Sequence, residues 1–249
     1  MTTEQNYDAL FAGVIGQEYQ LLKLLSPLSA QMSHLVGCTV ATHAAIAEQP
    51  LQVVELGGGT GITTLAILSQ HDNLTVLSID NEPVMQNQAK QHLHAWFAQQ
   101  KVTFCGDDAL TALRAIPTAS VDVVASAYTL HNFSDDYRAL VITESLRILK
   151  AGGHFINGDR YALDEVSRHT RLIQEEVSGY FKVLIGLQKL DVLEHWIVHL
   201  FSDESANHIM RETSALAQLK AAGFVDIKLS HRQQVNALVT AVKPALDML

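Results

Sequence analysis

Leu51–Thr64 reads LQVVELGGGTGITT, and this stretch decides which fold the sequence predicts. It begins with an apolar run that holds two β-branched valines, which is typical of a buried strand. The run stops at Glu55 and enters a loop with four glycines, which lack a Cβ and so permit unusual backbone angles and close approach of a ligand. We therefore predict a strand, a ligand-binding turn and a helix over Ile62–Gln70.

The spacing of the glycines favours one class of ligand over another. A dinucleotide-binding G-x-G-x-x-G loop would have glycine at position 62, but the chain has Ile62 there. A ligand with an ammonium and a carboxylate group needs an acid for the first and backbone amides for the second, and Glu55 with the glycine turn offers both. The segment resembles motif I of the class I S-adenosylmethionine-dependent methyltransferases, whose loop commonly reads acid-x-G-x-G-x-G. The resemblance implies that S-adenosylmethionine is bound by Glu55, Gly57, Gly59 and Gly61, and the alternative is a strand-to-helix turn of another Rossmann-like protein.

An acid at the end of the next predicted strand extends the resemblance. Asp80 follows the apolar strand Leu74–Ile79 and lies about 20 residues after the glycine loop, the offset at which an acid meets ribose hydroxyls in Rossmann-type sites. The alternative role is a cap for the helix that follows, because Asp, Glu and Pro are favoured at helix starts. The resemblance also places Asn81 beside the cofactor and Met85 against its adenine ring.

A third strand, Lys101–Cys105, runs into a glycine and two acids. The sequence Gly-Asp-Asp-Ala that ends at Ala109 resembles the family's "GDA" turn, in which an Asp accepts a hydrogen bond from the adenine amino group. The doubled acid leaves the register open. Asp108 matches the motif better, and Asp107 would then be exposed or would cap the helix 109–115. Ligands of open α/β sheets gather at these carboxyl ends of the strands.

The candidate catalytic residue follows the fourth predicted strand, Val121–Ser126. The loop after it carries Leu-His-Asn-Phe-Ser-Asp from Leu130 onward, which resembles the "LHxWSD" segment of small-molecule O-methyltransferases. The resemblance implies that His131 deprotonates the acceptor hydroxyl, as a neutral imidazole can near neutral pH, and that Ser126 lies at the cofactor. C-methyltransferases of quinone and sterol type have a similar "LHH" sequence with a structural histidine, and Phe133 replaces the tryptophan. A catalytic and a structural His131 therefore both stay open.

Two helical regions flank the cofactor motifs. Helical spacing with a break at Pro27 predicts a leader over residues 1–48, whose Tyr7 and Tyr19 we expect near the methionine end of the cofactor. Residues 160–206 resemble the substrate lid that this superfamily inserts after the fifth strand, with helices predicted over 165–190 and 191–200. Its candidate substrate contacts are Arg160, Tyr161 and Trp196.

A metal site is not expected in this lid. His195 and His199 are four residues apart and so share one helix face, which is a ligand spacing. The chain has 12 histidines and no nearby Glu-x-x-His pair, however, so that coincidence or pocket lining is the favoured interpretation.

The rest of the chain completes an α/β fold. The remaining predicted elements are a helix over 134–149 capped by Gly152 and Gly153, a strand over 154–157, a helix over 209–222, and two strands over 224–230 and 235–242. The turn between the last two strands is so short that they must form a hairpin. The resemblance implies a Rossmann-like sheet of seven strands in the order 3-2-1-4-5-7-6 with the last strand antiparallel, within a core over 49–249.

Composition limits the classes of function. A formal net charge of −9 without a cluster of basic residues disfavours nucleic acid as the substrate and favours a small molecule. Cys38 and Cys105 are few and far apart, which disfavours a disulfide framework and indicates a reducing compartment. No signal-peptide pattern and no uninterrupted apolar span is found, so we expect a cytoplasmic protein without a membrane partner. Whether it forms a homodimer is left open.

These observations favour an S-adenosylmethionine-dependent methyltransferase that acts on a small molecule, with S-adenosylhomocysteine as the second product. Oxygen is the expected acceptor atom, and carbon or nitrogen is the alternative. A non-methylating enzyme on the same fold, such as a pericyclic or carboxyl-transfer catalyst, stays open, as does a cofactor-binding protein without chemistry. The absence of an Asn/Asp-Pro-Pro-Tyr sequence after the fourth strand disfavours methylation of amino groups of DNA bases or glutamine.

Overall fold

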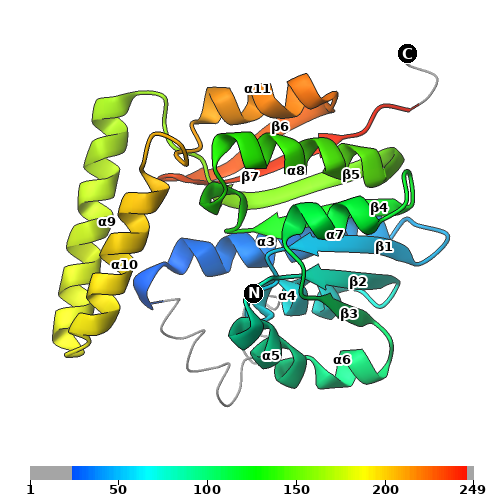
Figure 1. Ribbon diagram of the computed structural model, residues 1–249, viewed down its shortest axis with the longest axis horizontal. Helices are drawn as coiled ribbons and strands as arrows, with labels where there is room; N and C mark the ends of the chain where they lie inside the picture. The colour runs from blue at the N-terminus through cyan, green and yellow to red at the C-terminus, as the bar shows by residue number, and fades with distance from the viewer. Residues whose placement is uncertain (1–23, 246–249) are drawn as a thin grey trace.

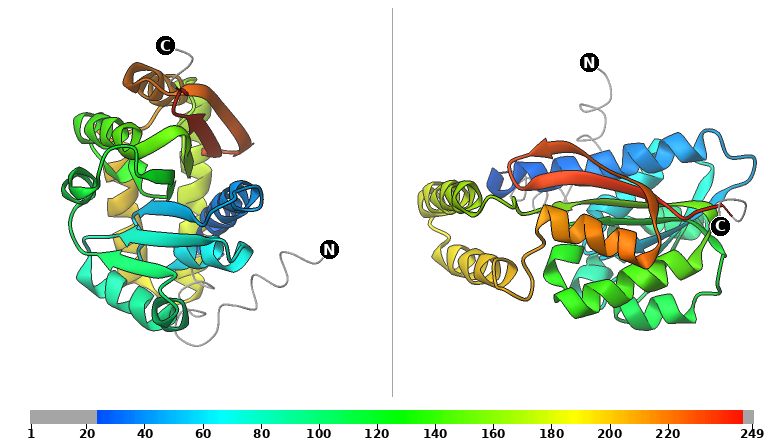
Figure 2. Two further views of the ribbon diagram at one scale, coloured as in Figure 1. Left: turned by 90° about the vertical axis from the view of Figure 1, so that its right-hand side faces the viewer. Right: turned by 90° about the horizontal axis from the view of Figure 1, so that it is seen from above.

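A computed structural model describes residues 24–245 and contains one sheet between two layers of helices (Figures 1 and 2). Tyr7, Tyr19 and the first half of the expected leader lie outside the described residues. The sheet has seven strands in the order β3-β2-β1-β4-β5-β7-β6. The strands are β1 Leu51–Leu56, β2 Leu74–Ile79, β3 Val102–Cys105, β4 Val121–Ala127, β5 Leu149–Arg160, β6 Val225–Gln233 and β7 Asn236–Val242. β7 is antiparallel to both of its neighbours and the other pairs are parallel, so the predicted topology is confirmed.

The sequence of β1 shows why both faces of the sheet are covered. Leu51 and Val53 belong to the hydrophobic cluster on one face, whereas Val54 and Leu56 belong to the cluster on the other. Successive side chains of a strand point to opposite faces, so a continuous apolar run needs helices on both sides. The helices around the sheet are α3 Pro27–Ala44, α4 Ile62–Gln70, α5 Pro83–His92, α6 His94–Ala98, α7 Ala109–Ala115, α8 Asp135–Ile148 and α11 Glu212–Ala222. Helices α3 and α4 share the first cluster, and α7, α8 and α11 share the second.

The glycine pair after α8 has a different role from the predicted one. Gly152 and Gly153 lie inside β5, which follows α8 directly at Leu149, and they do not cap the helix. Gly152 has φ +75°, a left-handed conformation that favours glycine. Its N–H donates to the carbonyl of Lys243, and the N–H of Lys243 donates to Gly153. The pair therefore lies at the irregularity in the pairing of β5 with β4 and hydrogen-bonds the residue that follows β7, which a sequence pattern could not reveal.

Two helices stand apart from the sheet. These are α9 Val166–Gly186 and α10 Leu190–Asp203, which lie side by side at the left of Figure 1. They have a hydrophobic cluster of their own, whose buried members are Leu25, Tyr180, Leu184, Leu193 and Leu200. A short 3-10 turn, η1 (Leu130–Asn132), contacts α10 from the end of β4. Within residues 24–245, no helix combines the length and the hydropathy needed to cross a bilayer.

The packing of α3 yields a stability prediction. Val40 of α3 is fully buried against the sheet, whereas Val84 of α5 is 66% exposed. We expect Val40→Ala to lower the free energy of unfolding by about 1–3 kcal/mol, because it removes buried methyl groups and leaves a cavity. Val84→Ala is the matched control and should change it by less than about 0.5 kcal/mol. Urea denaturation followed by circular dichroism measures both, and equal effects would show that α3 is not part of the core.

Candidate active site

A cavity of about 1030 Å³ opens where the carboxyl ends of the parallel strands meet α9 and α10. Parallel strands end at the same edge of a sheet, so loops that are far apart in sequence converge there. The predicted site residues that line this cavity are Gly57, Gly59, Asp80, Asn81, Met85, Asp107, Asp108, Ala109, His131, Arg160 and Trp196. The structure thus gathers most of the expected cofactor residues and the candidate base around one space.

Glu55 does not line the cavity, although the sequence pattern predicted a contact with the cofactor. It is fully buried behind the loop, and its Oε2 accepts a hydrogen bond from Thr64 Oγ1 at 2.6 Å. Burial raises the pKa of Glu55 to about 7, and hydrogen bonds from Thr64 and Ser78 oppose the shift. This hydrogen bond connects β1 to α4, the two elements on either side of the glycine loop, and so stabilises the loop.

Three other predicted contacts also lie outside the cavity lining. Ser126 is fully buried, and its hydroxyl donates to the carbonyl of Leu56. Tyr161 is buried, and its hydroxyl accepts from the side-chain amide of Asn157 at 2.8 Å. Gly61 is the N-cap residue that precedes α4, and its φ is +94°.

The glycine loop presents bare backbone to the cavity. A Cβ built on Gly57 would lie 2.0 Å from Thr129 Oγ1, whereas a Cβ on Gly59 would meet nothing within 4 Å. Because Gly59 lines the cavity, its side of the loop is open to a ligand. The N–H of Gly59 donates to Asp80 Oδ2 at 2.7 Å, and the N–H of Glu82 donates to Asp80 Oδ1 at 2.8 Å. Asp80 therefore holds the loop against the start of α5, and a carboxylate has further lone pairs for ligand hydroxyls.

The sequence left open which of the two neighbouring acids contacts the adenine and which caps the next helix. Asp108, not Asp107, caps α7: its Oδ1 accepts from the N–H groups of Leu110 and Thr111, both at 3.1 Å. It also accepts from Tyr137 Oη at 2.8 Å, and the hydrogen bonds, those of Thr111 first, lower the pKa of Asp108 to about 2. Asp107 is exposed to the cavity and accepts a hydrogen bond from the thiol of Cys105. Its carboxylate is the freer acceptor for an adenine amino group.

His131 is held by a buried acid that the sequence analysis did not identify. Asp159, at the end of β5, is fully buried, and its Oδ1 lies 2.5 Å from His131 Nδ1. Asp159 also accepts from the N–H of Leu130 at 2.9 Å and from the N–H of Arg160 at 2.8 Å. Burial alone would raise the pKa of Asp159, but the charge and hydrogen bond of His131 and the backbone hydrogen bond hold it below its usual range.

This arrangement decides which nitrogen of His131 carries the proton in the neutral ring. A carboxylate surrounded by donors acts only as an acceptor, so Nδ1 must be the donor to Asp159. The lone pair then lies on Nε2, which faces the cavity and α10. A strand-end acid two residues beyond the predicted fifth strand was the signal in the sequence that could have indicated Asp159.

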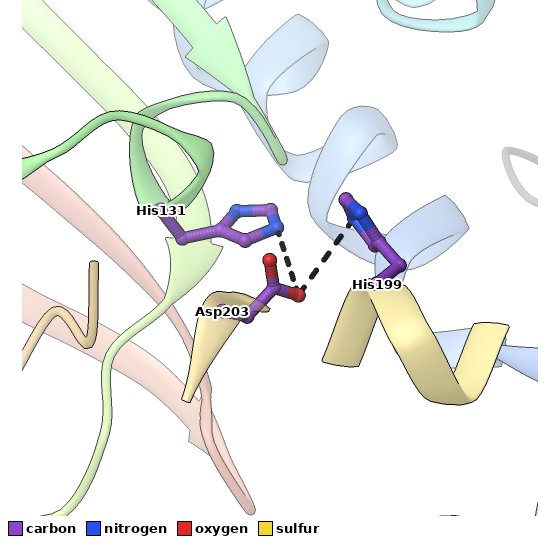
Figure 3. A group of neighbouring side chains, drawn as sticks. All are labelled: His131, His199 and Asp203. Atoms are coloured by element: carbon purple, nitrogen blue, oxygen red, sulfur yellow. Dashed lines mark ion pairs between the residues drawn. The ribbon is translucent and has the colours of Figure 1, made fainter. Parts of the chain in front are cut away.

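Helix α10 brings two more polar side chains to His131 (Figure 3). Nε2 of His131 and Nε2 of His199 each lie 3.7 Å from Oδ2 of Asp203. Asp203 is buried, which raises its pKa, and the two imidazoles oppose that shift. The sequence analysis missed Asp203 because it ended the lid helix at Leu200, although an acid four residues after His199 is spaced for contact with it.

Arg160 lines the cavity, but its positive charge is already paired with two glutamates. Its guanidinium group binds Glu176 of α9 through two hydrogen bonds of 2.7 and 3.1 Å and lies 3.4 Å from Glu204. Trp196 lines the same region and packs edge to face on Tyr180 at 5.3 Å between ring centroids. Among the described residues that line the cavity, Arg160 is the only lysine or arginine.

Because Asp107 and Asp108 make different contacts, we expect different results when each is changed to alanine. Asp108→Ala should lower the free energy of unfolding by about 0.5–2 kcal/mol, because it removes a helix cap. Asp107→Ala should leave stability unchanged and weaken S-adenosylmethionine binding about tenfold or more, the effect of losing a hydrogen bond to a charged group. Thermal unfolding and calorimetric titration measure the two quantities. Loss of affinity in Asp108→Ala alone would return the adenine contact to Asp108.

Comparisons with known proteins concern the domain and its fold. Residues 53–153 match the family model described as Methyltransferase domain. The carboxy-S-adenosyl-L-methionine synthases of Cronobacter sakazakii and of Escherichia coli O1:K1 / APEC are 26% and 24% identical over 180 residues, which cover 70% of this chain and 67% of each relative.

Solved structures share the fold. An O-methyltransferase family protein from Burkholderia thailandensis superposes with a TM-score of 0.64 at 16% identity, covering 96% of this chain and 62% of the other. The CurJ carbon methyltransferase superposes with a TM-score of 0.61 at 13% identity, covering 97% of this chain and 68% of the other. The chain thus spans roughly two thirds of the length of these proteins. Residues 53–153 thus match a methyltransferase domain, and the sheet order of the chain is that of the Rossmann-like methyltransferase fold.

Proposed function

We propose that this chain transfers the sulfonium methyl group of S-adenosylmethionine to an oxygen atom of a small molecule, with His131 as the general base. The observation that carries the proposal is the buried hydrogen bond between His131 Nδ1 and Asp159, which leaves Nε2 toward the cavity. The sulfonium already activates the methyl group, so the protein has to align the acceptor with it and remove one proton. A histidine fixed in one tautomer is suited to that task.

The size of the cavity supports a cofactor and a second molecule together. Pockets for one drug-sized ligand have volumes of about 300–1,000 Å³, and this cavity of about 1030 Å³ lies just above that range. We propose that the adenosine part lies along Asp80, Met85 and Asp107, and that the methionine part lies along the glycine loop. The methyl group would then face His131 and Trp196, which leaves the space below α9 and α10 to the acceptor.

Carboxyl transfer is the alternative that the curated relatives raise, because they are named carboxy-S-adenosyl-L-methionine synthases. Such chemistry handles additional carboxylate groups, which call for a free cation in the pocket. Arg160 is the only lysine or arginine among the described lining residues, and Glu176 and Glu204 already neutralise it. Methyl transfer is therefore favoured. Formation of S-adenosylhomocysteine in equal amount to a methylated acceptor would separate the two reactions.

Two accompanying proposals concern the setting of the enzyme. The substrate is a small molecule, because the cavity is of the size of small-molecule pockets and the chain is acidic. The compartment is the cytoplasm, because Cys38 and Cys105 are both unpaired, as expected under reducing conditions. Carbon and nitrogen acceptors stay alternatives to oxygen, since the same base could serve them.

The proposal predicts a specific kinetic defect. His131→Ala should lower kcat about 100- to 10,000-fold, the usual contribution of a general base, and leave the Kd of S-adenosylmethionine nearly unchanged. Phenols should lose less activity than alcohols, and their rate should recover as the pH is raised, because they ionise more readily. Steady-state kinetics and calorimetric titration provide the two measurements.

The matched control is His94→Ala, which changes an exposed histidine outside the cavity lining and should leave kcat unchanged. Full activity of His131→Ala at neutral pH, or its failure to fold, would contradict the assignment. In that case His131 is structural, and the quinone-type C-methyltransferases become the better guide to the reaction.

A further inference from the structure

Three potential metal ligands meet at the acceptor end of the cavity (Figure 3). His131 comes from η1, whereas His199 and Asp203 lie one turn apart on α10. One ligand atom of each side chain lies within 4.8 Å of the other two. The sequence paired His199 only with His195 and so gave no reason to expect a metal site. The other two members of the cluster come from η1 and from the end of α10.

The distances within this cluster fit an ion better than a hydrogen-bond network. Each imidazole Nε2 lies 3.7 Å from Asp203 Oδ2, which exceeds the length of an N–H···O hydrogen bond. Zinc lies about 2.0–2.2 Å from nitrogen and oxygen ligands, so two ligand atoms of a tetrahedral site are about 3.4 Å apart. The two histidine–Asp203 separations are thus within a few tenths of an ångström of this value, and the two imidazole nitrogens, which lie within 4.8 Å of each other, would have to approach by up to about 1.4 Å.

We propose that His131, His199 and Asp203 bind one divalent transition-metal ion, for which Zn²⁺ is the best match. Two imidazoles and one carboxylate suit zinc and its neighbours in the first transition row, whereas Mg²⁺ and Ca²⁺ prefer oxygen ligands. Three protein ligands leave one position open, which is the pattern of catalytic zinc sites. All three residues line the cavity, so the open position faces the space assigned to the acceptor.

The surroundings of the cluster are those of a preorganised ligand site. The side chains of His131 and Asp203 are 6% and 7% exposed, and both have their functional atoms on the cavity side. The hydrogen bond from His131 Nδ1 to Asp159 directs the Nε2 lone pair at the cluster, as second-sphere carboxylates do for metal-bound histidines. Arg160 does not supply a competing free cation, because Glu176 and Glu204 bind it.

The site would extend the proposed methyl transfer, on which this step rests. An acceptor hydroxyl in the open position would have a lower pKa, because the ion stabilises its conjugate base. Its proton would pass to bulk water, and its oxygen would form the bond to the methyl carbon while the carbon–sulfur bond breaks and leaves its electron pair on sulfur. In the metal-bound enzyme, His131 would act as a ligand in place of its role as general base, and the ion would activate the acceptor. The step therefore rests on methyl transfer to oxygen and not on proton removal by His131. The substrates favoured are therefore molecules with a hydroxyl that binds metal ions.

Titration calorimetry with Zn²⁺ alone, on the full chain after treatment with a chelator, tests the site without any assay of activity. We expect one Zn²⁺ per chain, and a loss of affinity above about 100-fold in His199→Ala and Asp203→Ala, since even second-sphere changes cost about 10- to 100-fold. Asp159→Asn changes a second-sphere residue and should lower the affinity for Zn²⁺ by about 10- to 100-fold. His195→Ala is the matched control on the same helix, and its Zn²⁺ affinity should stay at the wild-type value. Mg²⁺ should not bind there.

Any of three results would overturn the metal site. The first is that the wild-type chain binds no Zn²⁺ at all in the titration. The second is that the wild type, His199→Ala and Asp203→Ala bind Zn²⁺ with equal affinity, and the third is that His195→Ala shows the largest loss of Zn²⁺ affinity. Circular dichroism should show that each variant is folded, and His199, with half of its side chain exposed, can be replaced without disturbing the core. Methyl transfer that persists in chelator without Zn²⁺ binding would reject the site and keep the proposed function. Zn²⁺ binding without methyl transfer to any acceptor would keep the metal site and reject the proposed function.

Discussion

The site depends on one buried hydrogen bond, between Asp159 at the end of β5 and His131 in η1. Removing a carboxylate from water costs several kcal/mol unless donors surround it, and here the N–H groups of Leu130 and Arg160 supply two more hydrogen bonds. The same acid therefore fixes the turn after β4 and the ring of His131. Without it, the imidazole would have neither a defined tautomer nor a defined direction. Both proposed roles of His131 require its Nε2 lone pair to face the cavity.

The remaining architecture follows from where the strands end. The parallel strands deliver the glycine loop, Asp80 and Asp107 to one edge of the sheet, and β4 and β5 deliver the histidine and its acid to the same edge. The helices α9 and α10 then close this edge through a separate apolar cluster. Because α10 also places Asp203 beside His131, its packing determines more than the shape of the acceptor pocket. It also sets the charge that the reacting groups meet.

The resemblance to a known family predicted the sheet order. Local patterns sufficed to place the glycine loop, Asp80 and His131 at the ends of strands, because each position depends on its neighbours in sequence or on the end of one strand. Asp159 and Asp203 were missed because they lie just beyond the predicted ends of a strand and a helix, where local preferences specify structure least. The sequence left the register of Asp107 and Asp108 open, because the hydrogen bond that Tyr137 donates to Asp108 comes from another helix. Such partners are set by tertiary packing, which no spacing rule contains.

The tautomer of His131 tests the central claim most directly. A long-range proton–nitrogen NMR correlation spectrum distinguishes a protonated from an unprotonated ring nitrogen. It would be recorded on the protein with labelled histidines, at neutral pH and without added metal. The hydrogen bond to Asp159 predicts a proton on Nδ1 and a bare Nε2. A spectrum of Asp159→Asn should lose that pattern. A proton on Nε2 of the wild-type ring, whether neutral or doubly protonated, would contradict the account, because neither a general base nor a metal ligand could then act through that atom.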